Sequence, residues 1–201
     1  MSRLESVLEA IDRVNAEDPV TEFAAESGDE QPRCLLYGRR MSQRLAAYRP
    51  DADECLQIAV RGQHIQRWAI PRSDYPEGRQ GYHRWRRRLY GYHAELVDEL
   101  MAEHGYGDDE RARAASLVRK EDLKSDPDAQ TLEDIAAQVF LLHYLEPFMD
   151  DKADQYGPDK LHHIIRRTWR KMSPTGQEAA MQLPIPERAA SVVHAALDEQ
   201  A

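Results

Sequence analysis

The sequence predicts an all-α fold, a single-domain helical bundle, on three observations. Apolar residues recur mostly at three- and four-residue steps, which is the spacing of one face of a helix. No segment shows a sustained alternation of apolar and polar residues flanked by hairpin turns. With 201 residues and 41% apolar content, the chain is long enough to bury the core of one domain.

The first four predicted helices are delimited by turn and cap signals. An apolar stripe over residues 4–14 ends at an Asp-Pro turn, and a second helix is expected over 35–48 after a polar stretch. The third, over 52–68, stops before an Ile-Pro pair, because proline disfavours helix in the residue before it. A loop at 71–81, rich in proline, glycine and arginine, leads to the fourth helix at 82–104, which a glycine ends.

The second half of the chain predicts five further helices. One covers residues 109–120, and a Ser-Asp-Pro cap opens the next, over 127–148, whose middle is apolar nearly all round. Short helices are expected at 159–172, 174–181 and 186–199. No linker is long enough to divide the chain, so residues 1–201 are expected to form one domain.

Composition limits the classes of function and the compartment. Cys34 and Cys55 form no CxxC pair, so the sequence predicts free thiols in a reducing cytosol and no zinc site of that kind. No apolar run approaches the ~20 residues of a membrane span, so a soluble, cytoplasmic protein without a membrane partner is expected. A net charge of −9 makes nucleic acid an unlikely partner and favours a small anion. No oligomeric state follows from the sequence.

Arginines in and around the 71–81 loop indicate an anion site. Arg61, Arg67, Arg72 and Arg79 lie on or just after the helix that supplies His64, and a guanidinium binds phosphate or carboxylate with two parallel hydrogen bonds. Aromatic residues are frequent in the same stretch, which suits the stacking of a planar group. The alternative is that these arginines bridge acidic helices elsewhere in the chain.

Ionisable residues on otherwise buried helices are candidates for catalysis, because burying them is costly unless they are paired or liganded. These residues are His64, His93, Lys120, Glu133 and Asp134. Each also has a structural explanation: the histidines as hydrogen-bonded core residues, the acids as first-turn partners of a helix dipole, and the lysine as a solvated helix end.

The order of these residues resembles the HD-domain metal-dependent phosphohydrolases, which are all-α proteins. "AVRGQHI" is similar to the first motif at His64, "YHAELVDELMAEHGY" to the second at His93, and "LVRKEDLKSDPDAQTLEDIA" to the last two at Lys120 and Asp134. The resemblance implies an HD-like core at about residues 33–150 and a helical extension at 158–201.

Three positions depart from the HD-domain pattern. Ile65 stands where an aspartate is expected, Lys120 where a histidine is usual, and Tyr37 in "LLYGRRM" near the expected place of the early histidine. The resemblance implies a divalent metal held by His64, His93 and Asp134. The departures leave it equally open that no metal binds and that the Lys120 amine stands in for its charge.

A second resemblance covers nearly the whole chain. "QHIQRWAIPRSDYPEGRQGYHRWR", "TLEDIAAQVFL" and "TWRKMSPTGQEAA" resemble the uncharacterised family filed as domain of unknown function 4202. This family brings no established reaction.

Three functions are therefore compatible with the sequence. The first is an HD-like hydrolase of a small phosphorylated or otherwise anionic metabolite, such as a nucleotide, in which a histidine or a metal-bound water does the chemistry. The second is a degenerate HD-like protein that binds or senses an anionic metabolite without turnover. RNA binding ranks third, because the mixture of arginine and aromatic residues favours it and the net charge opposes it.

Overall fold

The structure is a computed structural model that describes residues 1–123 and 125–198, and it confirms the predicted all-α class. The chain divides into two compact units, Met1–Ala129 (unit 1) and Gln130–Ala201 (unit 2). The division falls inside a helix, α6 (Pro127–Val139), so no linker composition marks it in the sequence.

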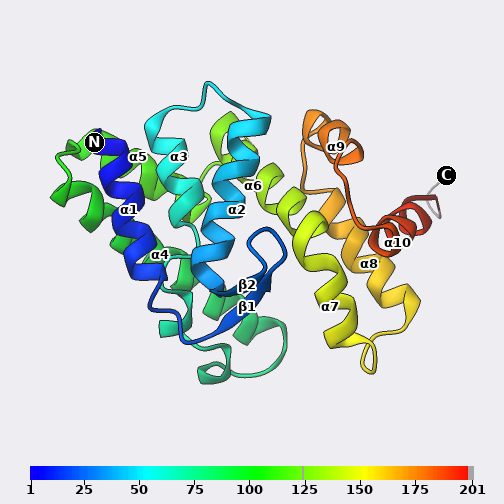
Figure 1. Ribbon diagram of the computed structural model, residues 1–201. Helices are drawn as coiled ribbons and strands as arrows, with labels where there is room; N and C mark the ends of the chain where they lie inside the picture. The colour runs from blue at the N-terminus through cyan, green and yellow to red at the C-terminus, as the bar shows by residue number, and fades with distance from the viewer. Residues whose placement is uncertain (124, 199–201) are drawn as a thin grey trace. The chain divides into compact units, whose positions relative to one another are not determined.

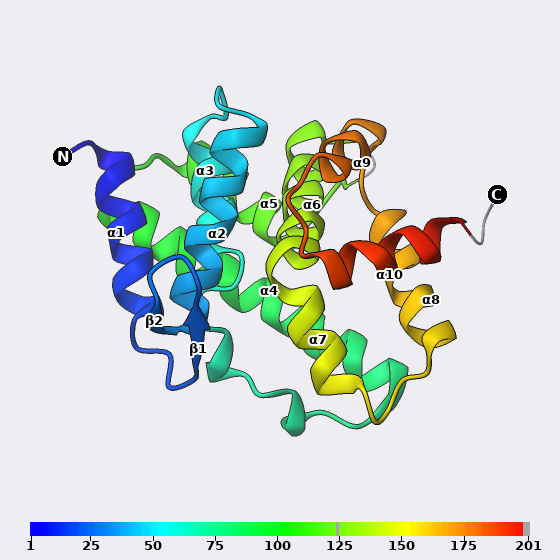
Figure 2. The ribbon, with the colours of Figure 1, turned by 45° about the vertical axis from the view of Figure 1, so that its right-hand side comes forward.

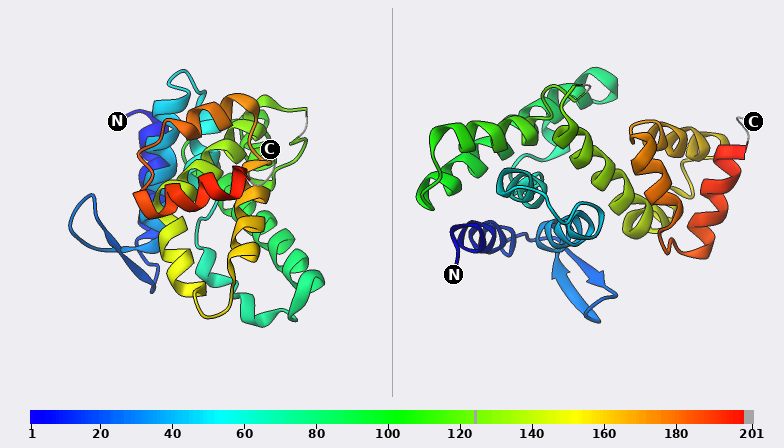
Figure 3. Two further views of the ribbon diagram at one scale, coloured as in Figure 1. Left: turned by 90° about the vertical axis from the view of Figure 1, so that its right-hand side faces the viewer. Right: turned by 90° about the horizontal axis from the view of Figure 1, so that it is seen from above.

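Unit 1 is built around α3 (Glu54–Gly62). On one side of α3 lie α1 (Arg3–Asn15) and α2 (Arg33–Tyr48), and on the other α5 (Asp108–Arg119), along which the long helix α4 (Gly78–Glu103) packs (Figures 1 and 3). The residues of α3 that are removed from solvent are Leu56, Ile58, Ala59 and Val60. The turn after α3 is consequently held from several sides.

A two-stranded hairpin that the sequence pattern did not predict follows α1. Strands β1 (Thr21–Ala24) and β2 (Asp29–Pro32) pair antiparallel and lie beside the start of α2 (Figure 2). The strands are only four residues long and mostly polar, so their sequences do not show the alternation of apolar and polar residues that predicts a strand. The buried guanidinium of Arg40 on α2 pairs with Glu22 at 2.9 Å and Glu26 at 2.7 Å, which ties the hairpin to the helix.

The predicted third helix, over 52–68, was too long. The structure ends α3 at Gly62 and continues through a turn to two short 3-10 helices, η1 (Arg67–Ala69) and η2 (Arg72–Asp74). Gln66 has a left-handed backbone, with φ 49°, which an α-helix cannot accommodate. His64 therefore lies in a turn and not on a helix.

The predicted helix over 127–148 is interrupted. After α6, the π-helical turn η3 (Phe140–Tyr144) leads into α7 (Leu145–Lys152). Leu141, Leu145 and Met149, spaced four residues apart, all belong to one buried core. In a regular α-helix, residues four apart differ by about 40° in direction, so a row of them gradually leaves the buried face. The wider π-turn reduces this difference and keeps the three side chains on the same face.

Unit 2 contains the three predicted short helices: α8 (Pro158–Trp169), α9 (Pro174–Met181) and α10 (Glu187–Asp198). Helices α8 and α10 pack together, and α10 also contacts α7 (Figure 1). Among the described residues, no helix combines the length and the apolar character that crossing a bilayer requires.

Candidate functional site

His64 lies in the turn after α3, where its ring stacks on that of Tyr37 from α2. The ring centroids are 4.2 Å apart and the planes differ by 19°. The side-chain amide of the neighbouring Gln63 donates to the Tyr37 hydroxyl at 3.0 Å. The turn and α2 together hold the imidazole in one orientation.

His93, on the buried face of α4, is the second imidazole of this region. Its ring centroid is 6.1 Å from that of His64, and the side chain is 0% exposed. Neither ring nitrogen meets the geometry of a hydrogen bond with a described residue, although the Ile65 carbonyl lies close enough to favour the protonated ring. Burial, followed by the nearby positive charge of Arg67, lowers the pKa of His93 to about 3, although the backbone of Ile65 counteracts this in part.

The pKa of His64 is also lowered, well below 6.5. Burial is the largest cause, followed by the positive charge of Arg67. Electrostatic interactions with His93, Lys120 and Arg86 lower the pKa further. Both imidazoles are therefore neutral at physiological pH, and they lie in a positive local field.

Arg67 carries the charge with the largest effect on His64. Its guanidinium lies 4.7 Å from the ring centroid of Trp85, and burial lowers its pKa. Among residues 1–123 and 125–198, no side chain forms an ion pair or hydrogen bond with this guanidinium. A partly buried arginine without an acidic partner is costly, and an anion would offset that cost.

Lys120 reaches the same region from the end of α5. It caps that helix in a left-handed conformation, with φ 58°, and its amine lies 5.9 Å from the centroid of the Tyr90 ring. We call Tyr37, His64, Arg67, His93 and Lys120 the histidine–arginine cluster.

The backbone of the turn is fixed by two further contacts. The Tyr92 hydroxyl donates a hydrogen bond to the side-chain oxygen of Gln66. The backbone N–H of Gln66 donates to the side-chain oxygen of Asn15 at 3.0 Å. A left-handed backbone at a non-glycine residue costs of order 1–3 kcal/mol and persists where neighbours hold it. Such positions are frequent in binding and catalytic sites.

The other three candidate arginines make contacts outside this cluster. Arg61 pairs with Asp12, with 2.9 Å between Nε and Oδ1. Arg72 donates to the carbonyls of Tyr75 and Pro76 at 2.8 and 2.9 Å, and so braces its own loop. Arg79 lies on the exposed face of α4, with its Nε 3.4 Å from a nitrogen of His83.

Glu133 and Asp134 belong to unit 2 and are buried there. The Asp134 carboxylate accepts hydrogen bonds from the backbone amide of Ser173 at 2.7 Å and from its hydroxyl at 2.5 Å, which holds the start of α9. Glu133 pairs with Lys171 at 3.4 Å. The expectation that these carboxylates meet the two histidines stays a prediction.

The residues of unit 1 suit an anion better than a divalent metal. The positive charges of Arg67 and Lys120 near His64 oppose a dication placed beside the imidazoles. In the part of the chain that the structure describes, no group of three or more His, Cys, Asp or Glu side chains is placed to hold a metal ion. The proposed metal ligands His64, His93 and Asp134 remain a prediction from the HD-domain resemblance.

Sequence reasoning did not select Tyr37, Gln66 or Arg86 for this site. The stacking of Tyr37 on His64 and the left-handed turn at Gln66 depend on how α2 and α4 pack, which no local pattern encodes. One signal was present for Tyr37, because it stands near the position where the HD-domain resemblance expects a histidine.

Comparison with known proteins identifies a family but no reaction. A family model described as Domain of unknown function (DUF4202) matches residues 5–193. No curated protein and no solved structure matches the chain.

Proposed function

Because the chain belongs to the DUF4202 family, whose description assigns no reaction, we propose its function from its own residues: unit 1 binds a small phosphorylated or otherwise anionic metabolite at the histidine–arginine cluster and hydrolyses it. The observation that carries the proposal is Arg67, a partly buried guanidinium that has no acidic partner among the described residues and lies beside two neutral imidazoles.

The anion would be held by charge and by geometry. The guanidinium of Arg67 supplies a planar pair of donors, and the charges of Lys120 and Arg86 add to the positive potential around His64. Stacking on Tyr37 fixes the ring plane of His64, so little rotational freedom is lost when a ligand binds.

His64 would act as the general base of a hydrolysis. Its lowered pKa keeps it unprotonated, and a bound anion, by opposing the positive charges that lower this pKa, would raise its basicity once substrate is present. For a phosphate ester, the water oxygen forms a bond to phosphorus and passes its proton to His64. The bond to the leaving oxygen breaks, and that oxygen takes the proton.

The second candidate is binding of the same anion without turnover. The pKa of His64 supports it, because an imidazole whose pKa is well below 6.5 is a weak base. Release of inorganic phosphate from a panel of phosphate esters distinguishes the two functions. A hydrolase releases phosphate, and His64→Gln abolishes the release. A protein that only binds the anion releases none.

The test of the anion site is calorimetric titration with inorganic phosphate or pyrophosphate. We expect Arg67→Met to weaken binding by about ten- to one-hundred-fold, because a hydrogen bond to a charged group contributes about 1.5–3 kcal/mol. Arg84→Gln, which removes an exposed arginine of α4, is the matched control and should bind as the wild type does. Equal affinity in the wild type and Arg67→Met would refute the proposed site.

A further inference from the structure

His64 and Arg67 are the first and last residues of one β-turn. The backbone N–H of Arg67 donates to the carbonyl of His64 at 3.2 Å, which closes the turn around Ile65 and Gln66. In a β-turn the first and fourth Cα atoms lie within about 7 Å of each other. The turn therefore brings together two members of the histidine–arginine cluster that would lie further apart on an extended chain.

The third residue of this turn, Gln66, has a backbone that glycine normally supplies. Its φ is 49° and its ψ is 37°, in the left-handed region, whereas Ile65 before it has no positive φ. A turn with a positive φ at its third residue alone favours glycine or asparagine there, because a Cβ crowds the following carbonyl oxygen. A glutamine keeps this conformation only where contacts from outside the turn compensate for its cost.

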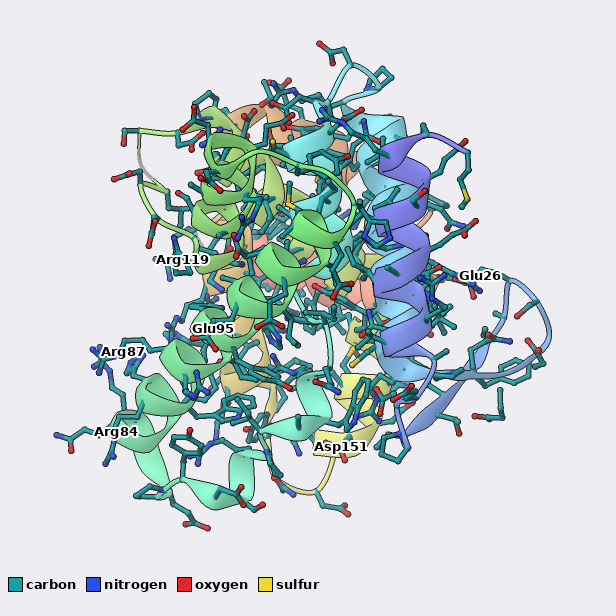
Figure 4. The ribbon with its side chains drawn as sticks, turned by 90° about the vertical axis from the view of Figure 1, so that its left-hand side faces the viewer. Glu26, Arg84, Arg87, Glu95, Arg119 and Asp151 are labelled. Carbon is teal, nitrogen blue, oxygen red and sulfur yellow. The ribbon has the colours of Figure 1, made fainter. Side chains whose placement is uncertain are left out.

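Two contacts from other helices hold Gln66 in this backbone. Its N–H donates to the side-chain oxygen of Asn15 at 3.0 Å, and its own side-chain oxygen accepts a hydrogen bond from the Tyr92 hydroxyl. Asn15, which is 1% exposed, ends α1, and Tyr92 lies on α4. These two helices pack together and lie on the same side of unit 1 (Figure 4). The turn is thus fixed by groups that are distant from it in sequence.

We propose that Gln66 is a positioning residue of the anion site, and that Asn15 and Tyr92 act through it. The turn then has its binding conformation before the anion arrives, so binding does not have to order it. If Gln66 left the left-handed region, His64 and Arg67 would separate, and the fraction of the chain that is competent to bind would fall. The apparent dissociation constant rises by the same factor. This inference rests on the proposed function, because it concerns how the same site is held.

Two other roles of Gln66 lead to different results on substitution. If its side-chain amide touched the anion, removing the amide would weaken binding whichever residue replaced it. If its contacts served stability alone, the variants would unfold more easily but bind the anion as the wild type does. Alanine and glycine at this position separate the three roles, because both lack the amide and only glycine adopts the left-handed backbone without steric cost.

The test is calorimetric titration of pyrophosphate into the full chain and its variants. We expect Gln66→Ala to weaken binding about five- to thirty-fold, the ratio that corresponds to the ~1–2 kcal/mol cost of a left-handed backbone at a residue with a Cβ. Gln66→Gly should bind within about two-fold of the wild type, because glycine needs no contact to stay in this backbone. Tyr92→Phe, which removes the hydroxyl that holds Gln66, should weaken binding about two- to ten-fold.

Tyr106→Phe is the matched control for Tyr92→Phe. It also removes a hydroxyl from unit 1, but one whose neighbours are Arg3 and Glu54 and not the turn. Its affinity for pyrophosphate should equal that of the wild type. Far-UV circular dichroism and urea titration check that each variant is folded under the conditions of the titration.

Equal affinities of Gln66→Ala and Gln66→Gly, whether reduced or unchanged, would overturn the inference and leave the anion site in place. Failure of the proposed function has a different signature. In that case the wild type does not bind pyrophosphate, or Arg67→Met binds it as tightly as the wild type does.

Discussion

The ring of His93 lies next to those of His64 and Tyr92, at 0% exposure and without a hydrogen bond to any described residue. The sequence singled out His93 from its position on an apolar helix stripe. It could not show whether the ring is satisfied by a partner, because that depends on side chains brought in from other helices.

The pKa of His93 makes stability depend on pH. Its folded-state pKa of about 3 is below the ordinary 6.5, so the unfolded chain binds the proton first as the pH falls. The stability gained by keeping the His93 ring neutral is fully present above about pH 6.5 and is lost as the pH falls toward 3. Over that range the free energy of unfolding falls by up to about 1.4 kcal/mol per pH unit.

We therefore expect His93→Leu to flatten the pH dependence of the free energy of unfolding between about pH 6 and 4. At pH 7 the variant should be as stable as the wild type or more stable, because it removes a buried polar group that has no partner among the described residues. Urea titrations at several pH values measure both quantities. A strong loss of stability at pH 7 would indicate that the imidazole has a partner.

Lys120 gives a second prediction, for metal binding. Lys120→His should raise the affinity of the chain for Zn²⁺ or Mn²⁺ if the HD-domain resemblance holds, because neutral imidazole offers a lone pair where the ammonium offers none. Histidine is also enriched among non-glycine residues with the left-handed backbone found at this position. Calorimetry on both proteins measures the affinities, and equal values would place residue 120 outside any metal site.

At the scale of elements, strong caps and prolines made helix positions predictable. The helix expected at 174–181 is α9 with the same bounds, because Ser173 caps it and Pro174 occupies its first turn. The error at the end of α3 came from Gln66, whose left-handed backbone depends on contacts with Asn15 and Tyr92 from other helices. Local sequence could not reveal those contacts.

Helix α9 also approaches α6 closely at Gly176, where a larger residue would displace a neighbouring side chain. A Cβ built on Gly176 would lie 2.5 Å from the carboxyl carbon of Asp134, and the side chain of Gln138 donates to the Gly176 carbonyl at 2.9 Å. The start of α9 is thus packed directly on α6 residues.

We expect Gly176→Ala to lower the free energy of unfolding by about 1–3 kcal/mol, the usual cost of overpacking. Gly91→Ala is the matched control, because a Cβ at that position, inside α4, has only the Glu95 carboxylate near it, at 4.0 Å. The control should raise the free energy of unfolding by about 0.5–1 kcal/mol, because alanine is the better helix former. Similar urea midpoints for both variants would show that α9 moves away from Asp134 at little cost.

At the scale of the whole molecule, the helical class followed from periodicity alone, since most of the chain repeats its apolar residues at helical spacing. The division into two units did not follow, because it lies within α6, where residue composition does not change. The candidate site was predictable as a set of residue types. The stacking on Tyr37 and the unpaired state of Arg67 among the described residues required tertiary structure.

The π-turn at Phe140–Tyr144 sets how the chain tolerates insertions and deletions. Because its hydrogen bonds run i→i+5, the π-turn holds about one residue more than the α-helical turn that it replaces. Deleting Leu142 would therefore restore a regular α-helix and leave the later side chains facing nearly the same way. Deleting Ala136 from the regular helix α6 would instead rotate every later side chain by about 100°. Leu145 and Met149 would then leave the core that they share with Ile165, at about 1.5–3 kcal/mol for each buried side chain. We therefore expect the chain to tolerate the loss of a residue inside the turn better than the loss of one in α6.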